Sequence, residues 1–246
     1  MGELVLKNVK QYMDGYDFSG QLNQTTVSFS ADIKDKTVFG SSGRKRTPGL
    51  TSVEISSVGF FSASSSSEVG PVLYNKIGGN RMAFSVIPEG TAVGNICYSA
   101  YNLAGEYSPG APVGELMSFN LAAYGEGGPL IRGEVFEIGS KTSDSNSTSR
   151  ELGNRGSTQR VYGALQVITM STSAGVTFDC NLLTDSSSDM GASPTTLLSF
   201  TQCTTDSIKT AEIKSTQGST TDNFYQFEFV FSSSATAKVV CSAGLR

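Results

Sequence analysis

Apolar and polar residues alternate with a period of two in short segments along this 246-residue chain. This feature constrains the fold more than any other. The clearest segment is "TTVSFSADI", in which hydroxyl and acidic residues alternate with Val27, Phe29, Ala31 and Ile33. Period-two alternation predicts a strand with one apolar and one wet face. Because Gly, Pro and Asp turns separate many such segments, we expect an all-β, mainly antiparallel fold.

In the first half, alternation predicts a strand from Leu4 to Met13, a turn at Asp14-Gly15 and a short returning strand. Further strands are expected at 25–33, 50–61, 81–90, 93–108, 114–126 and 131–141. The segment "SEVGPVLYNKIGG" predicts one short helix, with Ser67 as N-cap and Gly78-Gly79 as its end. These elements indicate a β-sandwich or barrel with one helix.

The second half holds six more strand candidates, at 160–171, 175–185, 195–203, 210–216, 223–233 and 237–245. Their regular spacing favours a β-sandwich or a small barrel. The polar stretch before them, 141–160, is either a junction between two β units or a long loop within the second. We predict two domains, 1–133 and 134–246, with the boundary between 126 and 160.

Four aromatic residues alternate along one predicted strand, which could serve as a ligand platform or as core. They are Tyr225, Phe227, Phe229 and Phe231. A continuous aromatic row on one face of a strand is more often core, so we predict that this face is buried.

Catalytic chemistry finds little support. The chain has no histidine, which removes Ser-His-Asp and Cys-His machinery and most zinc sites, and it has no phosphate-binding glycine motif. The absence of tryptophan argues against a glycosidase, although carboxylate pairs occur: Glu134 and Glu137 lie near Glu126, and Asp185 and Asp189 flank a serine-rich loop. The spacing of Asp179, Asp185 and Asp189 does not follow a calcium-binding loop. We therefore expect no catalytic, cofactor or metal site.

The charge balance also limits the possible partners. The formal net charge is −4, so a sequence-specific DNA-binding protein, which is normally basic, is not expected. An acidic surface would instead let DNA pass without sticking. Four cysteines without metal-type spacing, and no apolar leader, indicate free and mostly buried thiols: Cys97, Cys180, Cys203 and Cys241. No apolar run approaches membrane-spanning length, so no membrane partner is expected.

One polar segment, 34–49, concentrates basic residues in a chain with few charges. Its glycines and proline predict a long excursion between two strands. Nucleic-acid contact and an address signal are both disfavoured, which leaves a solvated loop or a contact with another protein. The residues of interest are Lys34, Lys36, Phe39, Arg44, Lys45 and Arg46.

The N-terminal third resembles the tail tube (major tail) proteins of tailed bacteriophages. The resemblance rests on a first strand, "GYDFSGQLNQ", an alternating strand, a polar loop with "TVFG", and "GL" before a strand that ends in "GFF". It covers residues 3–61 well and weakens towards residue 133. The segments "LGNRGSTQRVYGALQVITMS" and "PTTLLSFTQC" also resemble C-terminal parts of some phage tail proteins.

The resemblance implies a structural virion protein made in the cytoplasm of a bacterial host and placed in the tail. Subunits would join into rings, hexameric by family likeness, and rings would stack into a tube through which DNA is ejected. The 34–49 loop would then reach an adjacent ring, with its basic residues facing acidic groups and Phe39 as an apolar anchor. The alternatives are a capsid decoration or accessory virion protein and a carbohydrate-binding β module.

Overall fold

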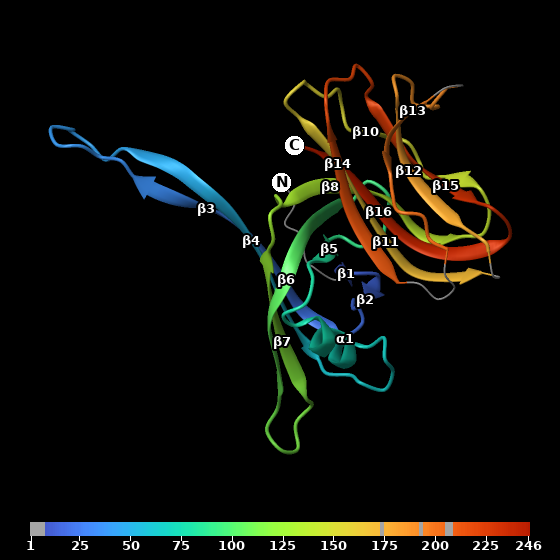
Figure 1. Ribbon diagram of the computed structural model, residues 1–246. Coiled ribbons are helices and arrows are strands. Elements are labelled where there is room, and N and C mark those ends of the chain that lie inside the picture. The colour runs from blue at the N-terminus through green and yellow to red at the C-terminus, as the bar shows by residue number, and fades with distance from the viewer. Residues whose placement is uncertain (1–7, 173–174, 192–193, 205–208) are drawn as a thin grey trace. The chain divides into compact units, whose positions relative to one another are not determined.

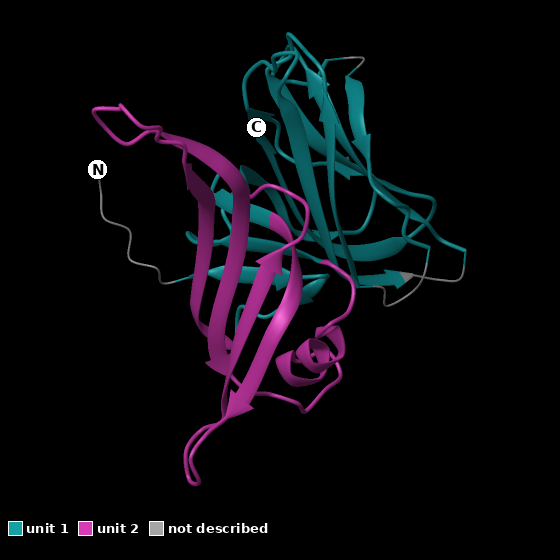
Figure 2. Ribbon diagram, turned by 60° about the vertical axis from the view of Figure 1, so that its left-hand side comes forward, with its two compact units in different colours: residues 1–20, 82–99, 131–246 teal, residues 21–81, 100–130 magenta. Residues whose placement is uncertain are grey.

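The structure is a computed structural model that describes residues 8–172, 175–191, 194–204 and 209–246 (Figure 1). The chain folds into two compact units (Figure 2). Unit 1 comprises 1–20, 82–99 and 131–246, and unit 2 comprises 21–81 and 100–130. The chain therefore enters and leaves unit 2 twice. The predicted domains 1–133 and 134–246 are contiguous in sequence, and they stay a prediction.

Unit 1 contains a long antiparallel sheet with the strand order β14-β11-β16-β8-β6-β5-β1-β2. In chain order its strands are β1 (Lys10–Met13), β2 (Tyr16–Asp17), β5 (Met82–Ile87), the first part of β6 (Ile96–Gly110), β8 (Ile131–Lys141), β11 (Arg160–Thr172), β14 (Thr210–Gln217) and β16 (Ala235–Leu245). The predicted strand from Leu4 is confirmed from Lys10 onward, and its first residues, up to Lys7, lie outside the described residues.

A second sheet of unit 1 has the order β10-β15-β12-β13, with β9 also paired to β15. Its strands are β9 (Ser145–Asn146), β10 (Arg150–Glu151), β12 (Phe178–Asp185), β13 (Thr195–Ser199) and β15 (Phe224–Phe231). β9 and β10 lie in the polar stretch 141–160 and pair with β15. Residues 145–151 of that stretch therefore belong to the C-terminal β unit.

The two sheets of unit 1 bury a shared core, which makes the C-terminal half a β-sandwich. Side chains from β11, β12, β15 and β16 form one hydrophobic cluster. The predicted aromatic row supplies four of its members, since Tyr225, Phe227, Phe229 and Phe231 are all buried while their neighbours on β15 are partly exposed. The aromatic residues are therefore core, as predicted, and not a ligand platform.

Unit 2 is a four-stranded antiparallel sheet with one helix. The sheet order is β3-β4-β7-β6, formed by β3 (Leu22–Asp35), β4 (Arg46–Phe60), β7 (Ser118–Gly125) and residues 102–110 of β6. The helix α1 (Val69–Lys76) lies against this sheet (Figure 2). A hydrogen bond from Gly78 N–H to Ala104 O (3.4 Å) and another from Val69 N–H to Gln21 Oε1 (3.0 Å) join the helix region to the strands.

The predicted helix exists, but its predicted N-cap is wrong. The N-cap position is Glu68, one residue after Ser67. The Glu68 carboxylate accepts hydrogen bonds from the Ser62 hydroxyl and from the Ser64 N–H (2.7 Å), which lowers its pKa. These hydrogen bonds thus tie the serine loop before the helix to the N-cap residue, Glu68. Gly78 adopts φ +67°, the left-handed conformation that a helix end favours.

Candidate assembly surface

The six predicted contact residues lie at the far end of a long β-hairpin formed by β3 and β4 (Figure 1). The predicted excursion 34–49 was too long, because polar residues continue the strand pairing to Asp35 and Arg46. Lys34 is therefore on β3 and Arg46 on β4, and the other four residues lie in the connecting loop, 36–45. We call residues 29–52 the arm.

Local hydrogen bonds hold the loop at the end of the arm. The Lys36 N–H donates to the Lys45 carbonyl (2.9 Å) and the Lys45 N–H donates to Thr37 Oγ1 (2.9 Å). The Thr37 N–H donates to Asp35 Oδ1 (2.8 Å), and hydrogen bonding from Thr37 lowers the pKa of this carboxyl. These hydrogen bonds therefore hold the loop as a turn that continues the hairpin.

Arg44, Lys45 and Arg46 are consecutive basic residues of the arm, which we call the basic triplet, and nearby acids do not neutralise them. Lys34 pairs with Asp32 at 2.5 Å. In the described part of the chain, no carboxylate lies within 4.0 Å of the charged groups of Arg44, Lys45 or Arg46. Three adjacent positive charges are therefore available to a partner.

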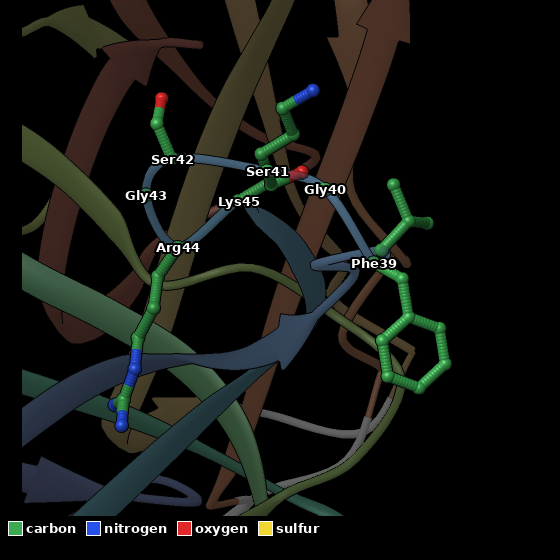
Figure 3. A pocket seen from close by; sticks show the side chains of 8 residues that line it. Phe39, Gly40, Ser41, Ser42, Gly43, Arg44 and Lys45 are labelled. Atoms are coloured by element: carbon green, nitrogen blue, oxygen red, sulfur yellow. The ribbon is translucent and has the colours of Figure 1, made fainter.

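Apolar side chains accompany these charges. Phe39 is fully exposed (108%) and Val38 is largely exposed. Figure 3 shows Phe39 and Arg44 leaving the loop in different directions around a shallow hollow of about 590 Å³, lined only by residues 38–45. Since the hollow is open to solvent and built by one loop, we interpret it as part of a protein contact rather than as a small-molecule pocket.

The sheet of unit 2 has one covered and one open face. Strand register places Ile55 of β4 opposite Val27 and Ala123, and Ser57 opposite Leu121, on the face that carries the buried residues. The open face is mixed. Register places hydroxyl, amide and acidic groups on it, namely Gln24, Thr26, Ser28, Ser30, Ser52, Glu54, Ser56, Asn120, Glu106 and Ser108, together with apolar and aromatic side chains, namely Val58, Phe60, Leu103, Ala122 and Tyr124. Segments 22–31, 51–60, 102–110 and 118–125 contain no Lys or Arg.

β3 is a terminal strand of this sheet. It is 14 residues long and pairs only with β4 among the described strands. Most of its residues are exposed, including Ile33 at 54%. A long edge strand with one unpaired side is a template for pairing with another chain.

A second exposed hairpin end was missed by the sequence reasoning. The turn between β6 and β7, together with the end of β6, forms residues 106–117, which we call the tip. Val113 (107% exposed) and Leu116 (77%) project there with Glu106 and Glu115. The signal in the sequence is "APVGELM", in which Val113 stands among turn residues and Leu116 and Met117 fall at the start of the expected strand 114–126.

The carboxylates considered for catalysis are engaged in local contacts. Glu134 pairs with Arg150 at 2.8 Å and Glu137 with Lys141 at 2.6 Å. Glu126 lies 3.8 Å from Arg81. These contacts explain Glu134 and Glu137 as members of partly buried ion pairs.

The aspartates considered for calcium are likewise hydrogen-bonded. Asp179 accepts from Gln202 Nε2 (2.9 Å), Asp185 from the Ser187 N–H (2.8 Å) and Asp189 from the Ser187 hydroxyl (2.6 Å). No cluster of three or more potential metal ligands occurs within the described ranges.

The four cysteines are free and buried, as predicted. Burial raises the pKa of the Cys97 and Cys241 thiols and raises that of Cys203 to about 11. These three thiols are therefore unreactive side chains of the interior. Within the part of the chain that is described, no helix has the length and apolar character needed to span a membrane.

No protein-family model matches this chain, and no curated protein matches it significantly. Among solved structures, it is similar to a chain of the virion of a native gene transfer agent particle (21% identity, 45% of this chain and 84% of that chain, TM-score 0.37). It is also similar to a chain of the tail of an empty gene transfer agent particle (22%, 44% and 79%, TM-score 0.35).

A third similar structure is the SPP1 Dit protein, described as a paradigm of the hub adsorption apparatus of phages that infect Gram-positive bacteria. It matches at 13% identity over 98% of this chain and 100% of that chain, with a TM-score of 0.38.

Proposed function

We propose that this protein is a structural protein of the phage virion tail, a subunit that oligomerises into stacked rings around a channel for DNA. The observation that carries the proposal is the open face of the unit 2 sheet, which carries hydroxyl, amide and apolar groups with the acid Glu54 and has no Lys or Arg along segments 22–31, 51–60, 102–110 and 118–125. Its work is assembly rather than catalysis.

The chemistry of the open face suits a channel wall. DNA binds proteins chiefly through Lys and Arg contacts to phosphates, which release counterions. A wall of hydroxyl, amide and apolar groups without Lys or Arg offers no such contact, and the Glu54 carboxylate repels the backbone weakly. DNA could therefore slide along this face without being held.

The free edge of β3 supports ring formation. A neighbouring subunit that pairs with this edge would satisfy its backbone groups and extend the sheet from one copy to the next. Because the two partners would use different surfaces, repetition of the contact closes into a ring when the rotation allows it. The basic residues of the arm would then face acidic groups of a neighbouring subunit.

Negative-stain electron microscopy of the purified protein at rising concentration tests this function. We expect rings or hollow tubes of uniform width with a central channel. A protein that stays monomeric at high concentration, even with a tail initiator present, contradicts the proposal and favours a decoration role. Affinity of the monomer for a polysaccharide would instead favour a carbohydrate-binding module.

A further inference from the structure

The arm and the tip lie at opposite ends of the same strand. β4 begins at Arg46, beside the loop of the arm, and its last residue, Phe60, pairs with Ser118, beside the tip. Both ribbon views show the two hairpin ends pointing away from each other within unit 2 (Figures 1 and 2). A strand of 15 residues at ~3.3 Å per residue separates them by roughly 45–50 Å.

The two ends carry opposite charge. The arm between 32 and 49 has five basic side chains against two acidic ones, a net charge of +3. The tip has two acidic side chains, Glu106 and Glu115, and no basic one, a net charge of −2. Opposite patches of this kind steer association and fix its orientation.

The two ends also carry matching apolar groups. Phe39 and Val38 stand at the end of the arm, and Val113 and Leu116 stand at the tip. All four are largely exposed, which costs free energy in water. Each end thus combines an apolar centre with charged surroundings, the usual composition of a protein interface.

We propose that the arm of one copy docks on the tip of a second copy, through apolar contact around Phe39 and ion pairs between the basic triplet and the tip acids. The inference rests on the proposed function, because it names the partner of the basic loop. The arm cannot reach the tip of its own chain, since β4 holds the two apart. Because each copy presents one arm and one tip, docking propagates from copy to copy.

Charge reversal tests the pairing. Variant A carries Arg44→Glu, Lys45→Glu and Arg46→Glu, and variant B carries Glu106→Lys and Glu115→Lys. In A the arm and tip are both negative, and in B they are both positive. We expect the concentration needed for half-maximal assembly, measured by sedimentation and electron microscopy, to rise at least about tenfold for each variant alone.

An equimolar mixture of A and B is the decisive sample. The negative arm of A meets the positive tip of B, and the positive arm of B meets the negative tip of A. We expect the mixture to assemble within about threefold of the wild-type concentration, as alternating copies. Unchanged unfolding midpoints of A and B would show that the substitutions act on assembly, since all five residues are exposed.

Cysteine crosslinking gives a second readout. Phe39→Cys protein mixed with Val113→Cys protein should form a covalent dimer with a short bis-maleimide, because the four native thiols are buried. Ser143→Cys in place of Val113→Cys is the exposed control and should give no dimer.

The outcomes separate this inference from the proposed function. If the wild type assembles while A and B assemble equally well, or while their mixture is not rescued, the arm–tip contact is wrong and the structural role stands. If the wild type does not assemble and the mixed Phe39→Cys and Val113→Cys proteins give no crosslinked dimer, both are wrong.

Discussion

At the scale of single residues, a buried glutamine links parts of unit 1 that are distant in sequence. Gln166 of β11 accepts a hydrogen bond from the Gly15 N–H (2.9 Å) and donates to the Ala83 carbonyl (2.9 Å). It is fully buried. The sequence shows only a polar residue inside an apolar strand, and its partners, 151 and 83 positions away, could not be inferred from local pattern.

Gln166→Leu should destabilise the protein by about 1–3 kcal/mol, because it leaves the buried Gly15 N–H without a partner and removes one hydrogen bond to the Ala83 carbonyl, which also accepts from the Asp14 N–H. Gln202→Leu is the matched control. Gln202 is exposed and bonds Asp179 at the surface, so its replacement should cost less than about 0.5 kcal/mol. Urea unfolding measures both values, and equal effects would contradict the assigned role of Gln166.

Cys203 makes stability depend on alkaline pH. Burial, and then the nearby Asp179 charge, raise its pKa from 9.0 to about 11. Between these values the unfolded chain loses the thiol proton while the folded chain keeps it. The stabilisation of the folded state by the protonated Cys203 thiol is therefore fully present below pH 9. As the pH rises towards 11 this stabilisation is lost, and the free energy of unfolding falls by roughly 2–3 kcal/mol.

The free energy of unfolding at pH 8, 9.5 and 11 measures this loss. The Cys203→Ala variant should show a shallower decline, whatever its stability at pH 8. An identical decline in wild type and variant would assign the alkaline effect to other groups, such as Cys97 and Tyr12, whose pKa values are also raised by burial.

At the scale of elements, alternation located the strands because half-buried strands need it. The alternating face of 25–33 was expected to be covered, yet the Phe29 and Ile33 side chains remain substantially exposed in the single chain. The same pattern continues from the packed part of the sheet into the arm, where nothing within unit 2 covers it. Sequence pattern reports which face is apolar, and it does not report what lies against it.

A matched pair of isoleucines tests this difference. Ile55 of β4 is buried (1% exposed), whereas Ile33 of β3 is not. Ile55→Ala should cost about 2–5 kcal/mol of unfolding free energy, because it leaves a cavity. Ile33→Ala should cost under about 0.5 kcal/mol in the monomer. Thermal and urea unfolding of dilute protein check both, and a large loss from Ile33→Ala would show that the arm packs within one chain.

At the scale of the whole molecule, the sandwich of the second half was predictable because its strands follow one another with clear turns. The sequence did not predict which segments form each compact unit, because each unit is built from segments that are separated in the sequence. The two hairpin ends of unit 2 differ in how visible they are in the sequence, and their contact roles stay predictions. The basic loop stands out by its charge, whereas the tip has two separated acids and is recognised as a hairpin end only through strand register.

The open face can be converted into a DNA-binding surface. Ser28→Lys with Glu54→Lys places two positive charges at paired positions on that face. The assembled variant should retain DNA at about 50 mM salt and release it at higher salt, because phosphate contacts depend on counterion release. Ser143→Lys with Glu151→Lys makes the same charge change in unit 1. Equal retention by both variants in a filter-binding assay would contradict the channel role of the open face.

The position of β16 in its sheet has a consequence for the order of synthesis. β16 lies between β11 and β8 and follows every other strand of the chain. During translation, all residues of unit 2 have left the ribosome before this central strand of unit 1 is made. The arm and tip are therefore synthesised while the sandwich still lacks β16. In the nascent chain the hairpins of unit 2 thus precede the strand that joins β11 to β8 in unit 1.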